Sequence, residues 1–379
     1  MAAYVVDSDQ HLYEPRRMWI DHIAPGDRAD ALTLVADDAG YTWLAWRGQR
    51  LELADVHMPG SVDSCGQHRE RLRRGEPPSY RYDEALPATY WDPAARVGWL
   101  DEVGLARAVC FPNFGLLWER RLSASLPALT ANMAAWNRWC RVIVSESGGR
   151  LYPVGHLTLR DPRWVQAQLG ELADAGVRLA MIAPAPVDGR PLSHPDHDRL
   201  WAAFVDHGVT PVFHVADQPR VFDDCWYTDP DTFVPVIESV FLWVPPALAL
   251  ADLILNGVFH RQPGLRVGVV ELSSIWVPQF LLMLDGGADF TTRLNGRPVA
   301  PLELRPSEYF RRHVRVSSFS YEDPRRLTQR SGDLFMCCSD FPHSEGTATP
   351  LADYAAAGCE PGSAAGLFHD NVTFLLGDS

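Results

Sequence analysis

Acidic and histidine side chains stand in or just after short apolar segments of this sequence, at Asp9, His11, His214, Glu271, Asp340 and His343. Asp9 and His11 are two residues apart, so on an extended chain both side chains point to the same face. Imidazole nitrogens and carboxylate oxygens are suitable ligands for Zn²⁺, or for a harder ion such as Mn²⁺. A single histidine at a strand end is more often structural, so the prediction of a metal site depends on several such residues meeting.

The elements that would position these residues are short apolar runs that alternate with helical patterns, which is typical of βα units. Eight runs are candidates for buried strands, at residues 4–6, 106–111, 151–156, 177–182, 210–214, 265–270, 314–317 and 334–338. The helical pattern that follows the run at 265–270 is predicted to end at Leu284. Eight βα units fit a (β/α)8 TIM barrel better than an open doubly wound sheet. In such an α/β barrel the C-terminal ends of the strands form one active site, which would bring the polar residues together.

The segment 31–93 departs from this alternation, and we expect it to be an insertion in a single barrel domain that spans residues 1–379. Residues 32–36 and 41–46 indicate an N-terminal β-hairpin. Residues 57–93 indicate a long lid-like loop, because loops of this length are usually functional or disordered. Its aromatic residues suit either a cyclic substrate or an oligomer contact, and they include Tyr80, Tyr82, Tyr90 and Trp91.

The charged residues exclude several kinds of chemistry. The 379 residues include 34 basic and 48 acidic ones, and every basic residue is arginine. Without lysine the chain cannot form a Schiff base, complete a P-loop or bridge two metal ions through a carboxylated lysine. The net charge of −14 and the lack of a basic stripe argue against a nucleic-acid partner. Arginine is the only fixed cation that could bind a substrate carboxylate by bidentate pairing.

The cysteines and the apolar segments predict a cytoplasmic protein that has no membrane partner. The seven cysteines form no C-x-x-C pair and are expected to be reduced. The N-terminus lacks the pattern of a secretory signal. The most apolar region, residues 240–255, is interrupted by two prolines and an aspartate and is too short to span a bilayer comfortably.

Five stretches resemble the amidohydrolase-related family, a branch of the amidohydrolase superfamily that contains metal-dependent hydrolases and decarboxylases built on a TIM barrel. They are VVDSDQHLYEP at 5–15, VTPVFHVAD at 209–217, LNGVFHRQPGLRVGVVELSSIWVPQFLLMLD at 255–285, CSDFPHSEG at 338–346 and DNVTFLLG at 370–377. They occur in the family's order over essentially the whole chain. The resemblance implies an enzyme with a small-molecule substrate, and a homo-oligomer, most simply a dimer.

The resemblance also implies a set of metal ligands. Asp9 would stand where many members carry the first histidine of an H-x-H pair, and His11 would be the second residue of that pair. His214 would be the third ligand and Asp340 the fourth. These residues would hold one divalent ion, Zn²⁺ in the first place and Mn²⁺ in the second, since the absence of lysine excludes a carbamate-bridged pair.

The acid and base residues are less directly implied. The family's decarboxylases typically place a histidine where this chain has Glu271. Glu271 would act as a general base if burial raised its pKa, or it would orient His214 or His343. His343 would supply the acid–base function or lie on the rim of the site. His156 is expected to face the barrel mouth and contact the substrate, or to be structural, and Glu14 is expected to brace the turn after the first strand.

We therefore expect a metal enzyme that acts on a small carboxylated compound, cyclic or aromatic. The first expectation is non-oxidative decarboxylation, in which Asp340 transfers a proton to the substrate carbon. Hydrolysis of a lactone, an amide or a C–C bond next to a carbonyl is the alternative, with Asp340 accepting a proton from water that the metal activates. A catalytically silent barrel that acts as a binding subunit is a third alternative. It is favoured by Glu271 and Asp9, and opposed by His11, His214 and Asp340.

Overall fold

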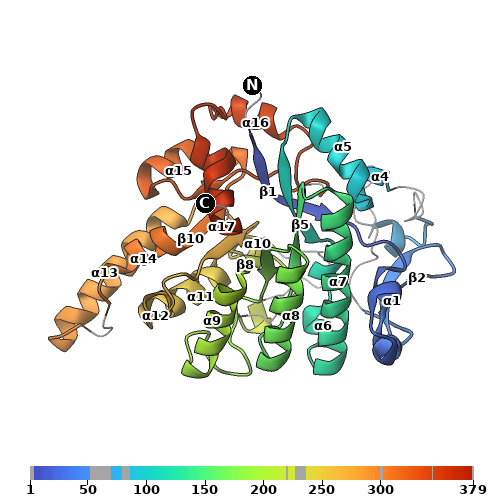
Figure 1. Ribbon diagram of the computed structural model, residues 1–379, viewed down its shortest axis with the longest axis horizontal. Helices are drawn as coiled ribbons and strands as arrows, with labels where there is room; N and C mark the ends of the chain where they lie inside the picture. Colours follow the sequence, from blue (N-terminus) through green and yellow to red (C-terminus); the bar gives the residue numbers. More distant parts are fainter. Residues whose placement is uncertain are drawn as a thin grey trace.

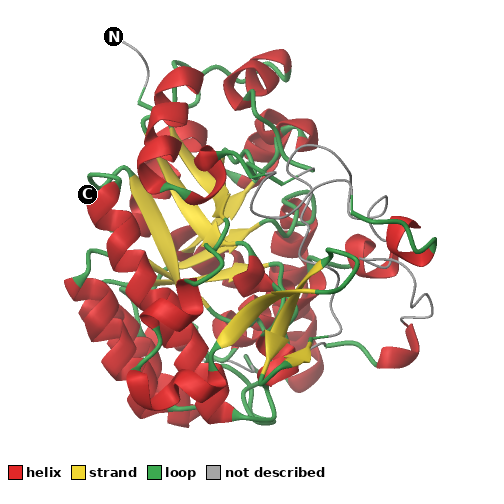
Figure 2. Ribbon diagram, turned by 90° about the vertical axis from the view of Figure 1, so that its right-hand side faces the viewer, coloured by secondary structure: helices red, strands yellow, loops and turns green. Residues whose placement is uncertain are grey.

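Eight parallel strands surrounded by helices form the body of the molecule (Figures 1 and 2). The structure, a computed structural model, describes residues 4–51, 70–78, 86–218, 221–226, 236–298, 302–343 and 345–377. The strands are β1 Val6–Leu12, β5 Arg107–Pro112, β6 Leu151–His156, β7 Leu179–Met181, β8 Thr210–His214, β9 Val267–Val270, β10 Val314–Ser317 and β11 Phe335–Met336. They pair in chain order, which confirms the predicted (β/α)8 TIM barrel.

The barrel is closed by backbone hydrogen bonds between β1 and the segment that follows β11. The amide of Ser8 donates to the carbonyl of Cys337 at 2.9 Å, and the amide of His11 donates to the carbonyl of Phe341 at 2.8 Å. The chain after the last strand is thereby fixed beside the C-terminal half of the first. β1 is also longer than predicted, since it continues to Leu12 and includes residues expected to follow it.

Helices cover the outside of the sheet, and the predicted βα alternation is present along the chain (Figure 1). Their bounds are α1 Met18–His22, α4 Ala88–Trp91, α5 Pro93–Val103, α6 Glu119–Leu122, α7 Leu126–Glu146, α8 Pro162–Asp174, α9 Asp198–His207, α10 Val236–Val240, α11 Val244–Leu255, α12 Val258–Arg261, α13 Val277–Asn295, α14 Pro306–His313, α15 Pro324–Ser331, α16 Pro350–Ala356 and α17 Asn371–Leu376. Aspartate caps fix some of the starts. The side chain of Asp92 accepts from the amide of Ala95, and that of Asp161 accepts from the amides of residues 163 and 164.

The predicted hairpin is present as β2 Leu32–Ala36 and β3 Thr42–Trp46, and a short strand β4, Gln49–Arg50, extends it (Figure 2). Much of the predicted lid, including Tyr80 and Tyr82, lies outside the described residues. Tyr90 is buried in α4 and its ring packs against Phe341 and Tyr13, so this residue belongs to the core.

The segment Val236–Leu255 is, among the described residues, long and apolar enough to cross a membrane, with a mean hydropathy of 1.6. In the structure it is divided between α10 and α11 by a turn at residues 241–243. Leu250 and Leu253 of α11 are fully buried in the hydrophobic core. Packing of a barrel helix therefore accounts for the apolar residues on the buried side of α11, whereas Leu248 of the same helix is 55% exposed.

Arg96 of α5 is a fully buried cation close to the end of β1. Its guanidinium donates to Gln10 Oε1 at 2.9 Å, to the carbonyl of His11 at 2.8 Å and to the carbonyl of Thr89 at 2.6 Å. Gln10 in turn donates to Asp7 Oδ2 at 2.8 Å. Burial lowers the pKa of Arg96 to about 10, so the group is charged at neutral pH. Its hydrogen bonds hold the backbone of β1 where the polar residues emerge.

We expect Arg96→Met to lower the free energy of unfolding by about 3 kcal/mol, because two buried acceptors and one part-buried acceptor lose their donor. Urea unfolding followed by circular dichroism would measure the change. Arg17→Met is the matched control, since Arg17 is 67% exposed and its ion pair with Asp21 lies on the surface. The control should change the stability by less than about 1 kcal/mol, and equal effects of the two substitutions would contradict this role of Arg96.

Glu14 is buried and braces the turn after β5, rather than the turn after β1 that the sequence suggested. Its carboxylate accepts hydrogen bonds from the backbone amides of Phe114 and Gly115, both at 2.8 Å. Burial raises the pKa of Glu14 from 4.5 to about 7, and the two hydrogen bonds offset only part of that rise. The folded protein therefore binds a proton at Glu14 that the unfolded chain releases at lower pH.

This difference predicts a pH-dependent effect of Glu14→Gln. The stabilising contribution of the protonated carboxyl group is complete below about pH 4.5 and is lost as the pH rises through 7. The stability of the wild type relative to Glu14→Gln should thus fall by up to about 3 kcal/mol across this range. Urea titrations of both proteins at several pH values would measure it, and a difference that is independent of pH would refute the raised pKa.

Candidate metal centre

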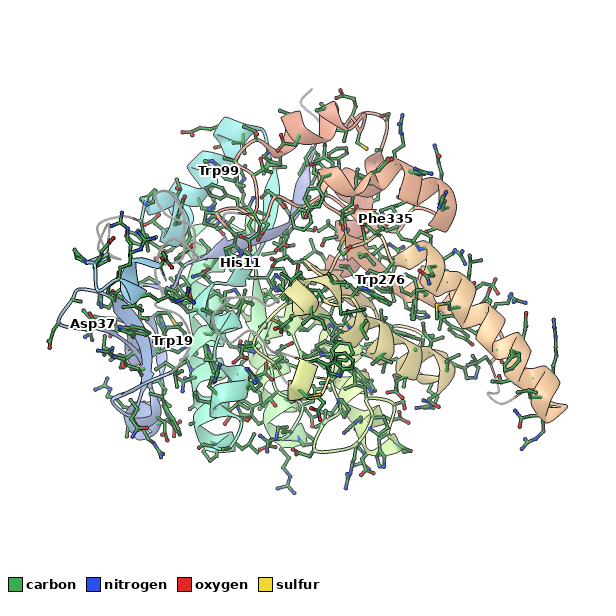
Figure 3. The ribbon with its side chains drawn as sticks, turned by 180° about the vertical axis from the view of Figure 1, so that it is seen from behind. His11, Trp19, Asp37, Trp99, Trp276 and Phe335 are labelled. Carbon is green, nitrogen blue, oxygen red and sulfur yellow. The ribbon has the colours of Figure 1, made fainter. Side chains whose placement is uncertain are left out.

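Six carboxylate and imidazole side chains meet at the C-terminal ends of the strands, around His11 near the centre of the molecule (Figure 3). They are Asp9 and His11 of β1, His214 of β8, Glu271 after β9, and Asp340 and His343 after β11. Their nitrogen and oxygen atoms form two overlapping groups of four residues, and within each group these atoms lie within 4.8 Å of one another. The structure thus brings every residue predicted for metal binding and for acid–base chemistry to one end of the barrel. Glu271 completes the group of Asp9, His11 and His214, and Asp340 lies in the second group, with His11, Glu271 and His343.

The atoms of the two histidine rings that face the cluster are both Nε2. Nε2 of His11 lies 3.1 Å from Asp340 Oδ1 and 3.5 Å from Asp9 Oδ1. Nε2 of His214 lies 3.1 Å from Glu271 Oε2 and 3.5 Å from Asp9 Oδ1. Asp9 therefore lies between the two rings. Among the described residues, neither Asp9 oxygen and neither Nε2 atom has a hydrogen-bond partner, although all are buried.

Backbone carbonyls set the tautomers of these two rings. Nδ1 of His11 lies 3.0 Å from the carbonyl of Pro112, and Nδ1 of His214 lies 2.8 Å from the carbonyl of Val215. A carbonyl oxygen can only accept, so Nδ1 carries the proton and Nε2 presents its lone pair. Burial lowers the pKa of both rings, and together with the nearby His343 it lowers that of His11 to about 3. Both rings are therefore neutral at pH 7, as metal ligation requires.

Three carboxyl groups share this buried space, and their pKa values shift in opposite directions. The pKa values of Asp9 and Glu271 lie well above their usual range, because both groups are buried and because Asp340 is close. Burial acts in the same direction on Asp340, but His343 and His11 outweigh it, and the pKa of Asp340 is lowered. Asp340 is thus the carboxylate that stays charged, while Asp9 and Glu271 need a compensating positive charge to ionise.

The backbone adopts left-handed conformations at two of these carboxylates, with φ of 54° at Glu271 and 56° at Asp340. Such conformations are costly for residues other than glycine and occur often at functional sites. The amide of Asp340 donates to the carbonyl of Asp9 at 2.8 Å, which fixes the turn to β1. Gly346 packs against the same turn, where a Cβ atom would lie 2.5 Å from the carbonyl oxygen of Asp340. The tight packing around this loop fixes the direction of the Asp340 side chain.

His343 is buried beside the cluster and not on its rim. Its ring stacks on His11 with 3.8 Å between the centroids, and its Nδ1 lies 2.9 Å from Asp340 Oδ1. Its Nε2 lies 3.0 Å from Asn113 Oδ1. Burial alone would lower the pKa of His343, but the Asp340 carboxylate and, more weakly, Glu271 outweigh it and raise the pKa to about 10. His343 is therefore a protonated imidazolium that holds a proton next to the cluster.

Glu271 lies inside the cluster and not behind the histidine rings. Its Oε2 atom lies 3.1 Å from Nε2 of His214 and 3.8 Å from Nε2 of His11. The group that orients His214 through Nδ1 is the carbonyl of Val215. This geometry favours a ligand or a general base at position 271 over a residue that orients His214.

A cavity opens beside His214, and its wall is mainly apolar. Phe222, Phe241, Leu242 and Leu272 contribute to this wall. A second, more polar cavity lies next to it, between the segments that follow β6 and β7, and its lining includes Glu119, Thr158 and Arg160. Gln218 lines the first cavity and donates to Glu119 Oε2 at 3.1 Å, so these two side chains stand between the cavities.

His156, which the sequence placed at the barrel mouth, is fully buried and lines neither of these cavities. Its Nε2 lies 3.1 Å from Glu119 Oε2, and its ring packs against Trp118. The structure therefore places His156 behind Glu119, outside the cluster. Sequence reasoning did not identify Glu119, which does not stand at the end of an apolar run, or Asn113, which directly follows β5 and could have been found by the same rule as the other residues.

No protein-family model and no curated protein matches this chain. Solved structures do match it over nearly its whole length. An amidohydrolase from Mycobacterium avium subsp. paratuberculosis K-10 superposes with a TM-score of 0.78 and 24% identity, covering 99% of this chain and 100% of the other.

Two decarboxylases are also similar. The 5-carboxyvanillate decarboxylase from Novosphingobium aromaticivorans, solved with manganese and a nitrobenzoic acid, has a TM-score of 0.66 and 17% identity over 99% of this chain and 97% of that one. The 2,6-dihydroxybenzoate decarboxylase from Rhizobium has a TM-score of 0.64 and 12% identity over 99% of each chain. At these identities the similarity establishes the fold alone: the chain shares its barrel architecture with these solved structures.

Proposed function

We propose that this chain is a decarboxylase of a small aromatic or cyclic carboxylate and that it depends on one divalent metal ion. The observation that carries the proposal is the buried cluster in which Asp9, His11 and His214 present unpartnered oxygen and nitrogen atoms to one another. Leaving such atoms unpaired is costly. A cation at their centre would remove that cost.

Asp9, His11, His214 and Asp340 are the residues that would hold the ion. Their donors are a mixture of imidazole nitrogen and carboxylate oxygen, which suits Mn²⁺ as well as Zn²⁺. The manganese in the structure of the 5-carboxyvanillate decarboxylase supports Mn²⁺ over the Zn²⁺ that the sequence alone favoured. When bound, the ion supplies a Lewis acid for the substrate carboxylate.

The protein's own residues would supply the proton. In decarboxylation the C–C bond to the carboxyl group breaks, CO₂ leaves, and the carbon keeps the electron pair and takes up a proton. His343 holds a proton at neutral pH, and Asp340 lies 2.9 Å from it and also contacts His11. These two residues form a path by which a proton reaches the substrate carbon. Glu271, with its raised pKa, is a second group that can carry a proton there.

The apolar cavity beside His214 supports a ring-containing substrate. Phe222, Phe241 and Leu242 offer a wall against which a planar ring can pack, at the edge of the proposed metal centre. Several similar structures are decarboxylases of aromatic acids, which supports the same substrate class. His156 would act only through Glu119, so we do not propose it as a substrate contact.

Hydrolysis is the second candidate. Glu271 could accept a proton from water in the cluster, and the structure with the TM-score of 0.78 is named an amidohydrolase. A silent binding barrel is less well supported, because it would leave an intact set of buried ligands without a use. We also propose a single domain with the insertion 31–93, located in the cytoplasm, without a nucleic-acid or membrane partner.

The first test concerns the metal. Purified wild type should contain about one divalent ion per chain. His11→Ala and Asp340→Ala should each lower metal affinity and activity by more than the roughly 10- to 100-fold that is typical when a residue hydrogen-bonded to a metal ligand is replaced. Inductively coupled plasma mass spectrometry would measure the content, before and after reloading of chelated protein with Mn²⁺ or Zn²⁺. His194→Ala is the control, since His194 lies outside the cluster. A metal-free wild type with full activity would rule out the proposal.

The second test separates the two reactions. Incubation with a panel of hydroxybenzoic and other cyclic acids in oxygen-labelled water should release CO₂ and yield a decarboxylated ring product that carries no labelled oxygen. In D₂O the product should carry deuterium at the former carboxyl position. His343→Gln should lower kcat by about 10²- to 10⁴-fold with metal content unchanged, since it removes the proton donor. Incorporation of labelled oxygen without CO₂ release would indicate hydrolysis instead.

A further inference from the structure

The long helix α13 extends beyond its neighbours, and its second half has little support from its own chain. Figures 1 and 3 show from opposite sides that its C-terminal part projects from the barrel. The buried residues of α13 are Val277, Leu281 and Leu284, all in its first half. The sequence predicted that this helix ends at Leu284, but it continues to Asn295. An unsupported helical extension of this length is only marginally stable in water.

Large apolar side chains lie on the side of α13 opposite its buried residues. Leu282, Met283, Phe290 and Leu294 are 76%, 61%, 61% and 70% exposed. Together with Gly286 they recur at intervals of three, four and eight residues, which places them on one side of a helix. We call these five residues the outer face of α13. The four side chains present on the order of 500 Å² of apolar surface, a size that marks interaction sites in soluble proteins.

We propose that the outer face of α13 binds the same face of a second copy of this chain, as an antiparallel helix pair that crosses at Gly286. The outer face is symmetric about this glycine, since Leu282 lies four residues before it and Phe290 four residues after it. A two-fold axis through Gly286 would pack Leu282 against the partner's Phe290, and Phe290 against the partner's Leu282. Such self-complementarity is the requirement for a closed, two-fold dimer. The proposal does not rest on the proposed catalytic function.

The glycines of α13 support a close helix–helix contact. Gly286 and Gly287 are in mid-helix, where each costs about 1 kcal/mol relative to alanine. A Cβ atom at either position would meet no atom of the described chain within 4 Å. Packing within the chain therefore does not require glycine at these positions. A second helix that approaches closely at Gly286 would require it.

The charges beside the outer face permit a second copy as the occupant. Two copies of a chain with a net charge of −14 repel each other, so they can associate only through a face without uncompensated carboxylates. Asp285 and Asp289 flank the outer face, and Arg305 pairs with both, at 3.0 and 3.1 Å. The outer face itself carries no acidic residue. About 1,000 Å² of total buried area lies near the lower limit of specific interfaces, which fits a reversible dimer.

Sedimentation velocity and light scattering of the full chain at micromolar concentrations would test this interface. We expect a wild-type dimer and a monomeric Leu282→Arg/Phe290→Arg variant, whose dissociation constant should rise at least about 100-fold. Leu248→Arg on α11 is the matched control, because Leu248 is the same residue type at 55% exposure and is not on α13. This control should remain dimeric.

A second variant covers the risk that two arginines disturb the helix. Gly286→Leu increases helix propensity but fills the crossing point, so it should weaken the dimer about tenfold or more while circular dichroism shows no loss of helix. Three results would overturn the proposal: a monomeric wild type, variants that dimerise as tightly as the wild type, or Leu248→Arg separating the dimer as effectively as the double variant. A monomeric wild type that sediments with phosphatidylglycerol vesicles would identify the face as a membrane contact instead.

Discussion

Burial of Asp9, Glu271 and Asp340 in one small space is the constraint on which the arrangement of the barrel mouth depends. Carboxylates at these distances repel one another, and burial removes the water that would screen them. A protonated His343 lies against Asp340, and a second buried cation, Arg96, lies beneath β1. The positions of these cations are therefore as important as those of the carboxylates. A fold that moved His343 would leave Asp340 without its counter-charge, and one that moved Arg96 would release the backbone of β1 at His11.

The hydrogen bonds that close the barrel also set the geometry of the cluster. The backbone bonds that join β1 to the segment after β11 also place Asp340 beside Asp9 and His11. Arg96 donates to the carbonyl of His11, and Asp7 accepts from the amides of Asp9 and Ser339. Any loosening of the hydrogen bonds between β1 and the segment after β11 would thus separate the proposed ligands. This coupling explains why so many polar groups are buried at the one place where the sheet could open.

The fold and the cluster could be predicted from the sequence because a parallel barrel has a simple rule, that the C-terminal ends of all strands meet. Residues such as His214 and Glu271 are adjacent to apolar runs, so the rule places them correctly. Arg96 could not be found in this way, because an arginine in a helix usually lies on the surface and only tertiary structure shows its burial. The continuation of α13 past Gly286 was missed for a related reason, since two glycines in succession normally favour the end of a helix.

The charge of the cluster bears on how many metal ions it would hold. With all three carboxyl groups ionised, Asp9, Glu271 and Asp340 contribute −3 and the imidazolium of His343 contributes +1, which leaves −2. One divalent cation balances this charge, whereas two would leave an excess of +2 in a buried site with no anionic bridge. A carboxylated lysine could supply such a bridge between two metal ions, but this chain contains no lysine. Composition and charge thus both support the proposal of a single ion, and a neutral site of this kind would accept one substrate carboxylate if Glu271 took up a proton as that carboxylate entered.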